Sequence, residues 1–232
     1  MSFKPNFDLL VEWKDAEKLR DCAGVSAPCI SVFKNSNKTL VYMCDKHTVN
    51  MSFDMVDFCF SENFGIKPDI LLTEIPNAGY QRRFGPHGLQ DNTLAYAVAV
   101  AAKNKIPFVF ADLSDEQMVE VISNKFTSDI DLHKVFSAGG PNSSGNIYQQ
   151  MDAYLDLYGR DRFMLENIAT ALNKYDTVFA IFGAGHYESQ RLVLEDMMGT
   201  PEYITKIKNM RGDFSNIKIE PIKLCDFKLK KE

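Results

Sequence analysis

The chain has 232 residues, 45% hydrophobic and 25% charged, which is the composition of a globular protein large enough to bury a substantial core. Its net charge of −5 does not provide the basic surface that nucleic-acid binding needs, and no apolar run approaches the ~20 residues of a membrane span. The five cysteines form no CxxC pair, so we expect neither a disulfide framework nor a structural zinc site.

Apolar periodicity predicts strands alternating with helices along the chain. The expected strands are residues 29–33, 39–43, 69–73, 106–111, 177–182 and 217–224. The expected helices are residues 8–21, 52–64, 91–103, one beginning at Ser114, 148–173 with a break near Gly159, and one from about Glu188 to Met198. Residues 29–33 and 39–43 flank a turn-rich segment and so predict a hairpin near the amino terminus. The alternation predicts one α/β domain over residues 1–232, with a mainly parallel sheet covered by helices on both faces.

Two segments are predicted to be loops. Residues 75–89 hold two prolines, three glycines and the adjacent Arg82 and Arg83, and they follow a predicted strand, where a loop can cover a site. We therefore include Arg82 among the candidate substrate-binding residues. Residues 137–146 are rich in glycine and serine, and they predict a flexible loop within the domain because the alternating pattern continues on both sides.

The stretch from Thr177 to Tyr187 carries the strongest local signal. Its apolar run is typical of a strand buried on both faces, and it ends at Gly183, Gly185 and His186. Open α/β folds bind ligands at the carboxyl ends of their strands, so His186 is a candidate site residue. A tight turn with an incidental histidine is the alternative interpretation.

Polar side chains follow four of the predicted strands at the point where each ends: His47, Glu74, Asp112 and His186. In a parallel sheet these ends meet at one edge, so the side chains can share a cleft. Two imidazoles and a carboxylate can hold a divalent cation and leave positions open for water. Alternatively, one histidine acts as general base toward water while the glutamate orients it.

Asp112, Glu74 and the neighbouring Cys44 each have another interpretation. Asp112 fits a turn or helix cap better than a substrate contact, although we keep it as a candidate for the latter. Glu74 lies in an apolar context, and burying it unpaired would cost several kcal/mol, so we expect Arg82, Arg160 or a metal as its partner. Cys44 fits a small packing residue better than a nucleophile.

Arg160 and Asp161 form a further charged pair within a predicted helix. Such an arginine can bind a substrate carboxylate or stabilise a developing oxyanion. Local sequence alone favours an exposed cluster of charges on the helix.

Together these segments resemble the TraB/PrgY and Tiki group, within the fold shared with erythromycin esterases and ChaN-like haem-binding proteins. The segments that carry the resemblance are residues 40–47, which are similar to the first Gly-x-x-His motif, residues 66–74, which end at the family glutamate, Arg160-Asp-Arg-Phe-Met164, and Gly183-Ala-Gly-His186. Cys44 stands where the group has a glycine, and Gly159 where it commonly has a glutamate.

The resemblance implies an α/β fold in which His47, Glu74, Arg160 and His186 line one cleft. In the Tiki branch such residues serve metal-dependent peptide hydrolysis, in the esterase branch a histidine activates water without a metal, and the ChaN-like branch binds haem. We expect a hydrolase of a peptide, amide or ester bond, with manganese, cobalt or zinc held by His47, Glu74 and His186. A metal-independent esterase or amidase is the alternative, and the departures at Cys44 and Gly159 also permit a non-catalytic binding protein.

The first residues contain no apolar segment of the kind found in secretory signals, which predicts a cytoplasmic protein. Its expected partner is a small molecule or peptide, with neither nucleic acid nor membrane. Met197 and Met198 are compatible with the core or with an interface between copies, so a homo-oligomer stays open.

Overall fold

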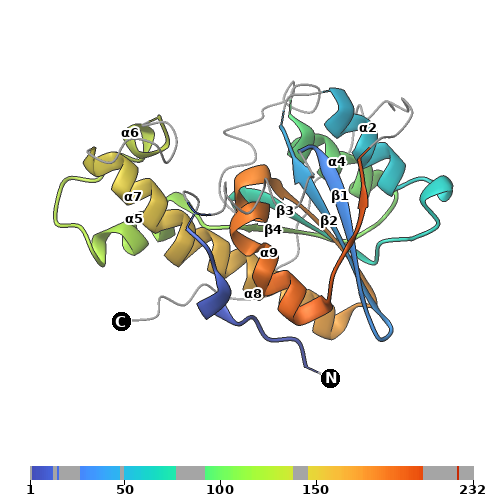
Figure 1. Cartoon of the computed structure of the whole chain (residues 1–232). Helices are drawn as coiled ribbons and strands as arrows, with labels where there is room; N and C mark the ends of the chain where they lie inside the picture. Colours follow the sequence, from blue (N-terminus) through green and yellow to red (C-terminus); the bar gives the residue numbers. More distant parts are fainter. Residues whose placement is uncertain are drawn as a thin grey trace.

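The computed structural model describes residues 2–12, 15, 27–47, 50–76, 92–137, 146–205 and 224. Its centre is a six-stranded sheet in the order β4-β3-β5-β2-β1-β6 (Figure 1). The strands are β1 (Cys29–Asn35), β2 (Lys38–Asp45), β3 (Ile70–Pro76), β4 (Phe108–Asp112), β5 (Thr177–Gly183) and β6 (Glu202–Ile204).

Four neighbouring strands, β4, β3, β5 and β2, run parallel, so their carboxyl ends lie at one edge of the sheet. β1 is antiparallel to both of its neighbours. The predicted hairpin is confirmed: β1 and β2 pair from Cys29↔Cys44 to Asn35↔Lys38. Ser36 in its two-residue turn has a φ of 57°, in the left-handed region that tight hairpin turns require.

Helices cover both faces of the sheet, which confirms the predicted α/β class. The helices are α2 (Asn50–Cys59), α4 (Thr93–Lys103), α5 (Asp115–Ser123), α6 (Leu132–Ser137), α7 (Ile147–Leu155), α8 (Asp161–Lys174) and α9 (Ala184–Met198). Short 3₁₀ turns span Phe7–Leu9 and Glu62–Phe64, and a π-helical turn spans Asp156–Arg160. None of the helices in the described ranges has the length and apolarity to cross a bilayer.

The side chains of each strand alternate between two cores. On one face, Tyr42, Leu72 and Ala180 pack with residues of α8 and α9. On the other face, Val41 and Phe179 pack with residues of α2 and α4. A third cluster joins α5 and α7 beyond the end of β4, so these helices lie together at one side of the sheet (left in Figure 1).

Several boundaries differ from the prediction. The helix predicted over residues 52–64 ends at Cys59, and Glu62–Phe64 is a separate 3₁₀ turn that Gly65 closes with a φ of 70°. The strand Glu202–Ile204 was not predicted, because three residues at a sheet edge give no apolar run. The helix predicted over 8–21 begins as the 3₁₀ turn Phe7–Leu9, and most of its remainder lies outside the described residues. Most of residues 75–89, 137–146 and 217–224 also lies outside them.

Candidate active site

The carboxyl ends of β2, β5 and β3 bring two predicted site residues together around Gly183. β5 lies between β2 and β3, and Gly183 pairs with Asp45 of β2. A Cβ atom on Gly183 would lie 3.0 Å from Glu74 Oε2 and 3.2 Å from His47 Nε2. The absence of a side chain at this position is therefore what allows the carboxylate and the imidazole to approach each other.

The side chain of Glu74 is 11% exposed, and both oxygens of its carboxylate contact nitrogen atoms. Its Oε1 accepts a hydrogen bond from Arg160 Nη2 at 2.7 Å and lies 3.3 Å from His186 Nε2. Its Oε2 accepts the backbone N–H of Gly183 at 2.6 Å. Burial would raise the pKa of Glu74, but the charges of His186 and Arg160 outweigh it and hold this pKa well below its usual range. Glu74 is therefore ionised at neutral pH.

His186 lies between two carboxylates. Its Nδ1 is 2.8 Å from Asp161 Oδ1, and its Nε2 faces Glu74. Burial would lower the pKa of His186, but the charges of Glu74 and Asp161 raise this pKa well above its usual value. The side chain is only 8% exposed, and the pair of acceptors favours an imidazolium that donates from both nitrogens.

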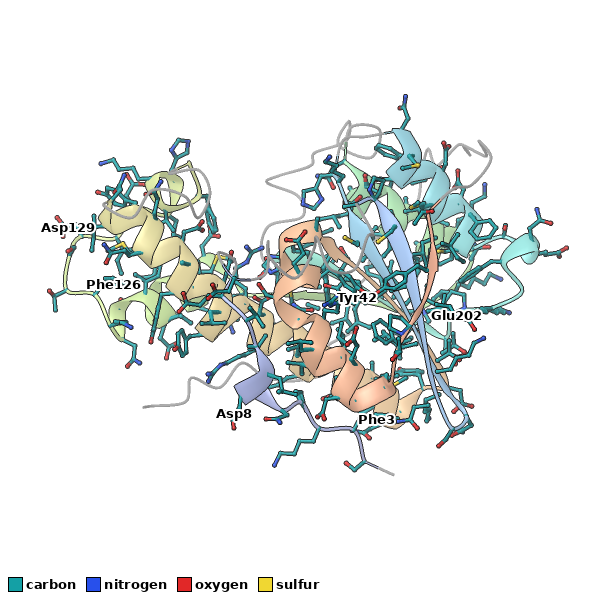
Figure 2. All side chains as sticks on the ribbon, viewed as in Figure 1. Phe3, Asp8, Tyr42, Phe126, Asp129 and Glu202 are labelled. Atoms are coloured by element: carbon teal, nitrogen blue, oxygen red, sulfur yellow. The ribbon has the colours of Figure 1, made fainter. Side chains whose placement is uncertain are left out.

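A chain of buried hydrogen bonds continues behind His186. Gln190 Nε2 donates to Asp161 Oδ1 at 2.7 Å, and Tyr42 OH donates to Gln190 Oε1 at 3.1 Å. Tyr42, labelled in Figure 2, belongs to β2, while Gln190 is one turn after His186 on α9. The chain ties the histidine to the sheet and fixes its orientation.

The second histidine has its own aspartate. His47 Nδ1 lies 2.6 Å from Asp45 Oδ2, and Asp45 is fully buried. The side chain of His47 is 41% exposed, so it is the solvent-facing member of the site. Burial would lower the pKa of His47, but the hydrogen bond to Asp45 and the charge of Glu74 outweigh it and raise this pKa above its usual value.

The backbone of His47 is also anchored. Its carbonyl oxygen accepts hydrogen bonds from Thr93 Oγ1 at 2.8 Å and from the Thr93 N–H at 3.1 Å, at the first turn of α4. Asn92 caps the same helix through the N–H groups of Leu94 and Ala95. The imidazole is thus fixed both through its ring and through its main chain.

Arg160 lies among three carboxylates. It contacts Asp112 through Nε and Nη2 at 3.1 and 2.9 Å, Asp156 through Nη1 at 2.9 Å, and Glu74 through Nη2. These contacts occupy four of the five N–H groups of a guanidinium. The predicted partner of Glu74 is therefore Arg160, and Asp112, which also accepts the N–H of Leu113, belongs to the same ion-pair network.

The π-helical turn before α8 contains Arg160 and places it beside these carboxylates. The neighbouring Gly159 lies in the same turn, where a side chain would be too close to other residues. A Cβ atom on Gly159 would lie 3.1 Å from both Leu113 Cδ1 and Val121 Cγ2. A larger residue would have to displace these two side chains, so the contact with Leu113 and Val121 favours glycine at this position. Asp152 lies on α7, one helical turn before Asp156. Burial and the charge of Asp156 raise the pKa of Asp152 to about 7.

The arrangement does not fit a divalent cation. Both oxygens of Glu74 already accept N–H groups, and both nitrogens of His186 face carboxylates. The guanidinium of Arg160 supplies positive charge beside Glu74, where a metal would otherwise supply it. Within the described part of the chain, no group of three His, Cys, Asp or Glu side chains is arranged to hold a metal ion.

The four principal candidates, His47, Glu74, Arg160 and His186, thus converge at one sheet edge, whereas Arg82 lies outside the described residues. His186 was expected before a helix but lies in the first turn of α9, which begins at Ala184. Sequence reasoning gave no role to Asp45 and Gln190, which help to orient the histidines. It favoured an exposed charge cluster for Arg160 and Asp161, and this was wrong, because Asp161 is buried and contacts His186 Nδ1. The spacing of Gln190, four residues after His186 on one helix, was the signal available.

Scans of family models, of curated proteins and of solved structures find no match to this chain.

Proposed function

We propose that the chain is a hydrolase of an ester or amide bond in which His47 acts as general base on water without a metal. The observation that carries the proposal is the pair of Asp45 and His47, in which a buried carboxylate holds Nδ1 of a partly exposed imidazole. A hydrogen bond of this kind selects the tautomer with the proton on Nδ1 and leaves Nε2 free to accept one from water.

The second part of the proposal concerns the ionised Glu74 beside His47. When His47 takes a proton, the resulting imidazolium lies between Asp45 and Glu74, and both negative charges stabilise it. Glu74 stays ionised because Arg160 and the imidazolium of His186 hold it. His186 and Arg160 therefore act on the reaction through Glu74, whose charge stabilises the imidazolium of His47.

Membership of the TraB/PrgY, Tiki and erythromycin esterase fold group is part of this proposal. It is supported by the mainly parallel sheet and by the convergence of the residues from all four motif segments. Among the branches of that group, the saturated ion pairs favour the metal-independent esterase or amidase over the metal-dependent peptidase. The substrate is then a small molecule or a peptide with an ester or amide bond.

A panel of activated esters and anilides, assayed with and without a chelator, tests the proposal. We expect hydrolysis that the chelator does not change and that His47→Ala and Glu74→Gln each abolish. His133→Ala, which changes an exposed histidine on α6, is the matched control and is expected to leave the rate unchanged. Hydrolysis that requires added manganese, cobalt or zinc would contradict the assignment of His47 as a metal-independent base.

One observation favours a second function, a binding protein without catalysis. Arg160 donates one hydrogen bond to Glu74 and the others to Asp112 and Asp156, while Glu74 also accepts the N–H of Gly183. A network closed in this way suits a rigid wall of a ligand cleft as well as an active site. A ligand that copurifies and stays chemically unchanged on long incubation, with no hydrolysis of any panel substrate, would favour this function over the first.

A further inference from the structure

Two cysteines face each other across the hairpin, outside the ion-pair network. Cys29 of β1 and Cys44 of β2 are directly opposed in the antiparallel register. Both side chains belong to the core beneath α9, with residue exposures of 1% and 3%, and both are free thiols. Cys59, the remaining described cysteine, lies on α2 and packs in the core of the opposite face.

The backbone geometry suits a covalent link between them. Directly opposed residues of antiparallel strands have Cα atoms about 4.5 or 5.5 Å apart, depending on the type of pair. Disulfides span Cα separations of about 4.4–6.8 Å. The two thiols lie close enough for each to shift the pKa of the other, so both side chains are on the same face of the hairpin.

The two thiols differ in chemical character. The hydrogen bond from Cys44 lowers the pKa of Cys29, and this effect exceeds that of burial, while Ser31 lowers it further. The same hydrogen bond, together with burial, raises the pKa of Cys44 well above its usual value. Because the thiolate is the nucleophile and Cys29 stands at the first position of β1, Cys29 is the thiol that reacts first and Cys44 the one that follows.

We propose that Cys29 and Cys44 are a dithiol modification site that reduces a peroxide and closes to a disulfide across β1 and β2. The Cys29 thiolate attacks one oxygen of hydrogen peroxide, the O–O bond breaks, and the hydroxide released takes up a proton to give water. The Cys44 sulfur then attacks the Cys29 sulfenic acid, the S–O bond breaks, and a second water leaves. The sum is two thiols and one hydrogen peroxide giving one disulfide and two waters.

The position of Cys29 gives the oxidant a route. Cys29 is the first residue of β1, and the pairing of β1 with β6 begins only at the next residue, Ile30. Opening of this strand end breaks few ladder contacts, and strand ends open more readily than strand centres. Cys44 directly precedes Asp45, which holds His47, so the bridge would close beside the candidate active site.

Peptide mapping of the folded, oxidised protein tests the proposal. The protein is treated with hydrogen peroxide, its free thiols are blocked with N-ethylmaleimide, and it is digested without reduction. We expect a cross-linked peptide containing Cys29 and Cys44, two hydrogens lighter than its parts and released by dithiothreitol. Cys59→Ser and Cys22→Ser should give the same cross-link, because neither thiol takes part.

The variant Cys44→Ser separates the two steps. It should stop at the Cys29 sulfenic acid, which dimedone labels, and it should give no cross-link. Circular dichroism before and after treatment establishes that each protein is folded. Recovery of both wild-type cysteines as alkylated thiols, or a cross-link from Cys29 to Cys22 or Cys59, would overturn the proposal. Neither result depends on hydrolase activity, so the two proposals fail independently.

Discussion

Gly183 donates its backbone N–H to Glu74 Oε2 over 2.6 Å, and the space beside its Cα is filled by Glu74 and His47. The end of β5 therefore provides both a hydrogen-bond donor and the clearance that the site needs. Its φ of −58° is open to any residue, so the requirement for glycine here is one of space.

This geometry predicts that the substitution Gly183→Ala lowers activity. The new methyl group would lie 3.0 Å from Glu74 Oε2 and 3.2 Å from His47 Nε2, so each side chain must move away from it by a few tenths of an ångström. We expect hydrolysis to fall by about tenfold, which is less than the ~10²-fold loss for a displacement of 1 Å at a reacting centre. Steady-state kinetics on the best panel substrate measures it.

Gly65→Ala is the control for this variant. Its new methyl group meets nothing within 4 Å, but the φ of 70° strains the backbone, so stability falls by about 1 kcal/mol. Activity should stay at the wild-type value. If Gly183→Ala were as active as Gly65→Ala, the close approach would have no part in the reaction.

Arg160→Met should destabilise the protein strongly. It leaves the carboxylates of Glu74, Asp112 and Asp156 without their shared cation, and breaking a buried ion pair in this way costs about 3–5 kcal/mol. Urea unfolding followed by circular dichroism measures the loss.

Arg162→Met, two residues further on, is the matched control. Arg162 lies over the rings of Tyr158 and Phe7, at 4.9 and 5.4 Å from the ring centres, and it forms no ion pair with another residue of the described ranges. Its loss should cost about 1 kcal/mol, in the range of a cation–π contact. Equal destabilisation by the two variants would argue against a special role of the Arg160 network.

The stabilising effect of His186 should depend on pH with a definite sign. Its folded pKa is raised above the usual 6.5, so the imidazolium stabilises the fold fully below pH 6.5 and less as pH rises through the folded pKa. The difference in unfolding free energy between wild type and His186→Gln should therefore shrink as pH rises from 6.

Urea titrations between pH 6 and 10 follow this difference. Glu74, whose folded pKa is lowered, is ionised in both folded and unfolded states throughout this range and adds no slope. A difference that grows with pH would mean that His186 is buried neutral.

The buried chain behind His186 can be tested through its far end. Tyr42→Phe removes the donor to Gln190 Oε1 and leaves a fully buried acceptor unsatisfied, which costs about 1–3 kcal/mol. Tyr203→Phe removes a hydroxyl from a partly exposed edge strand, and it should cost less. Unfolding curves in which the two variants are equally stable would contradict the role given to the chain.

The sequence predicted those features that depend on local pattern. The apolar runs before Glu74 and His186 are long enough to identify strands, and the rule that parallel strands end at one edge then places the side chains that follow. The cost of burying an unpaired carboxylate gave Arg160 as one of three alternative partners for Glu74. The hairpin followed from the turn residues between two apolar runs.

The remaining features depend on register and packing, which local pattern does not encode. Whether Asp45 or another acid holds His47 depends on how β2 continues into its loop, and Asp161 meets His186 only because α8 and α9 pack side by side. The saturation of Arg160 by three carboxylates comes from three separate elements. From the sequence we therefore expected Arg160 to contact the substrate and the two histidines to bind a metal. The geometry instead favours an ion-pair network in which these side chains contact one another.

The pH dependence of kcat/KM, measured for wild type and Asp45→Asn, tests most directly whether His47 is the general base. The rate should rise with pH through a pKa above 6.5, because only neutral His47 accepts a proton. In Asp45→Asn the midpoint should move to lower pH and the plateau should fall, since the hydrogen bond and charge that raise the pKa are lost. Asp152→Asn, which removes the carboxyl that titrates at a pKa of about 7, should leave the midpoint in place. A midpoint unchanged by Asp45→Asn, or a rate that falls as pH rises, would contradict the account.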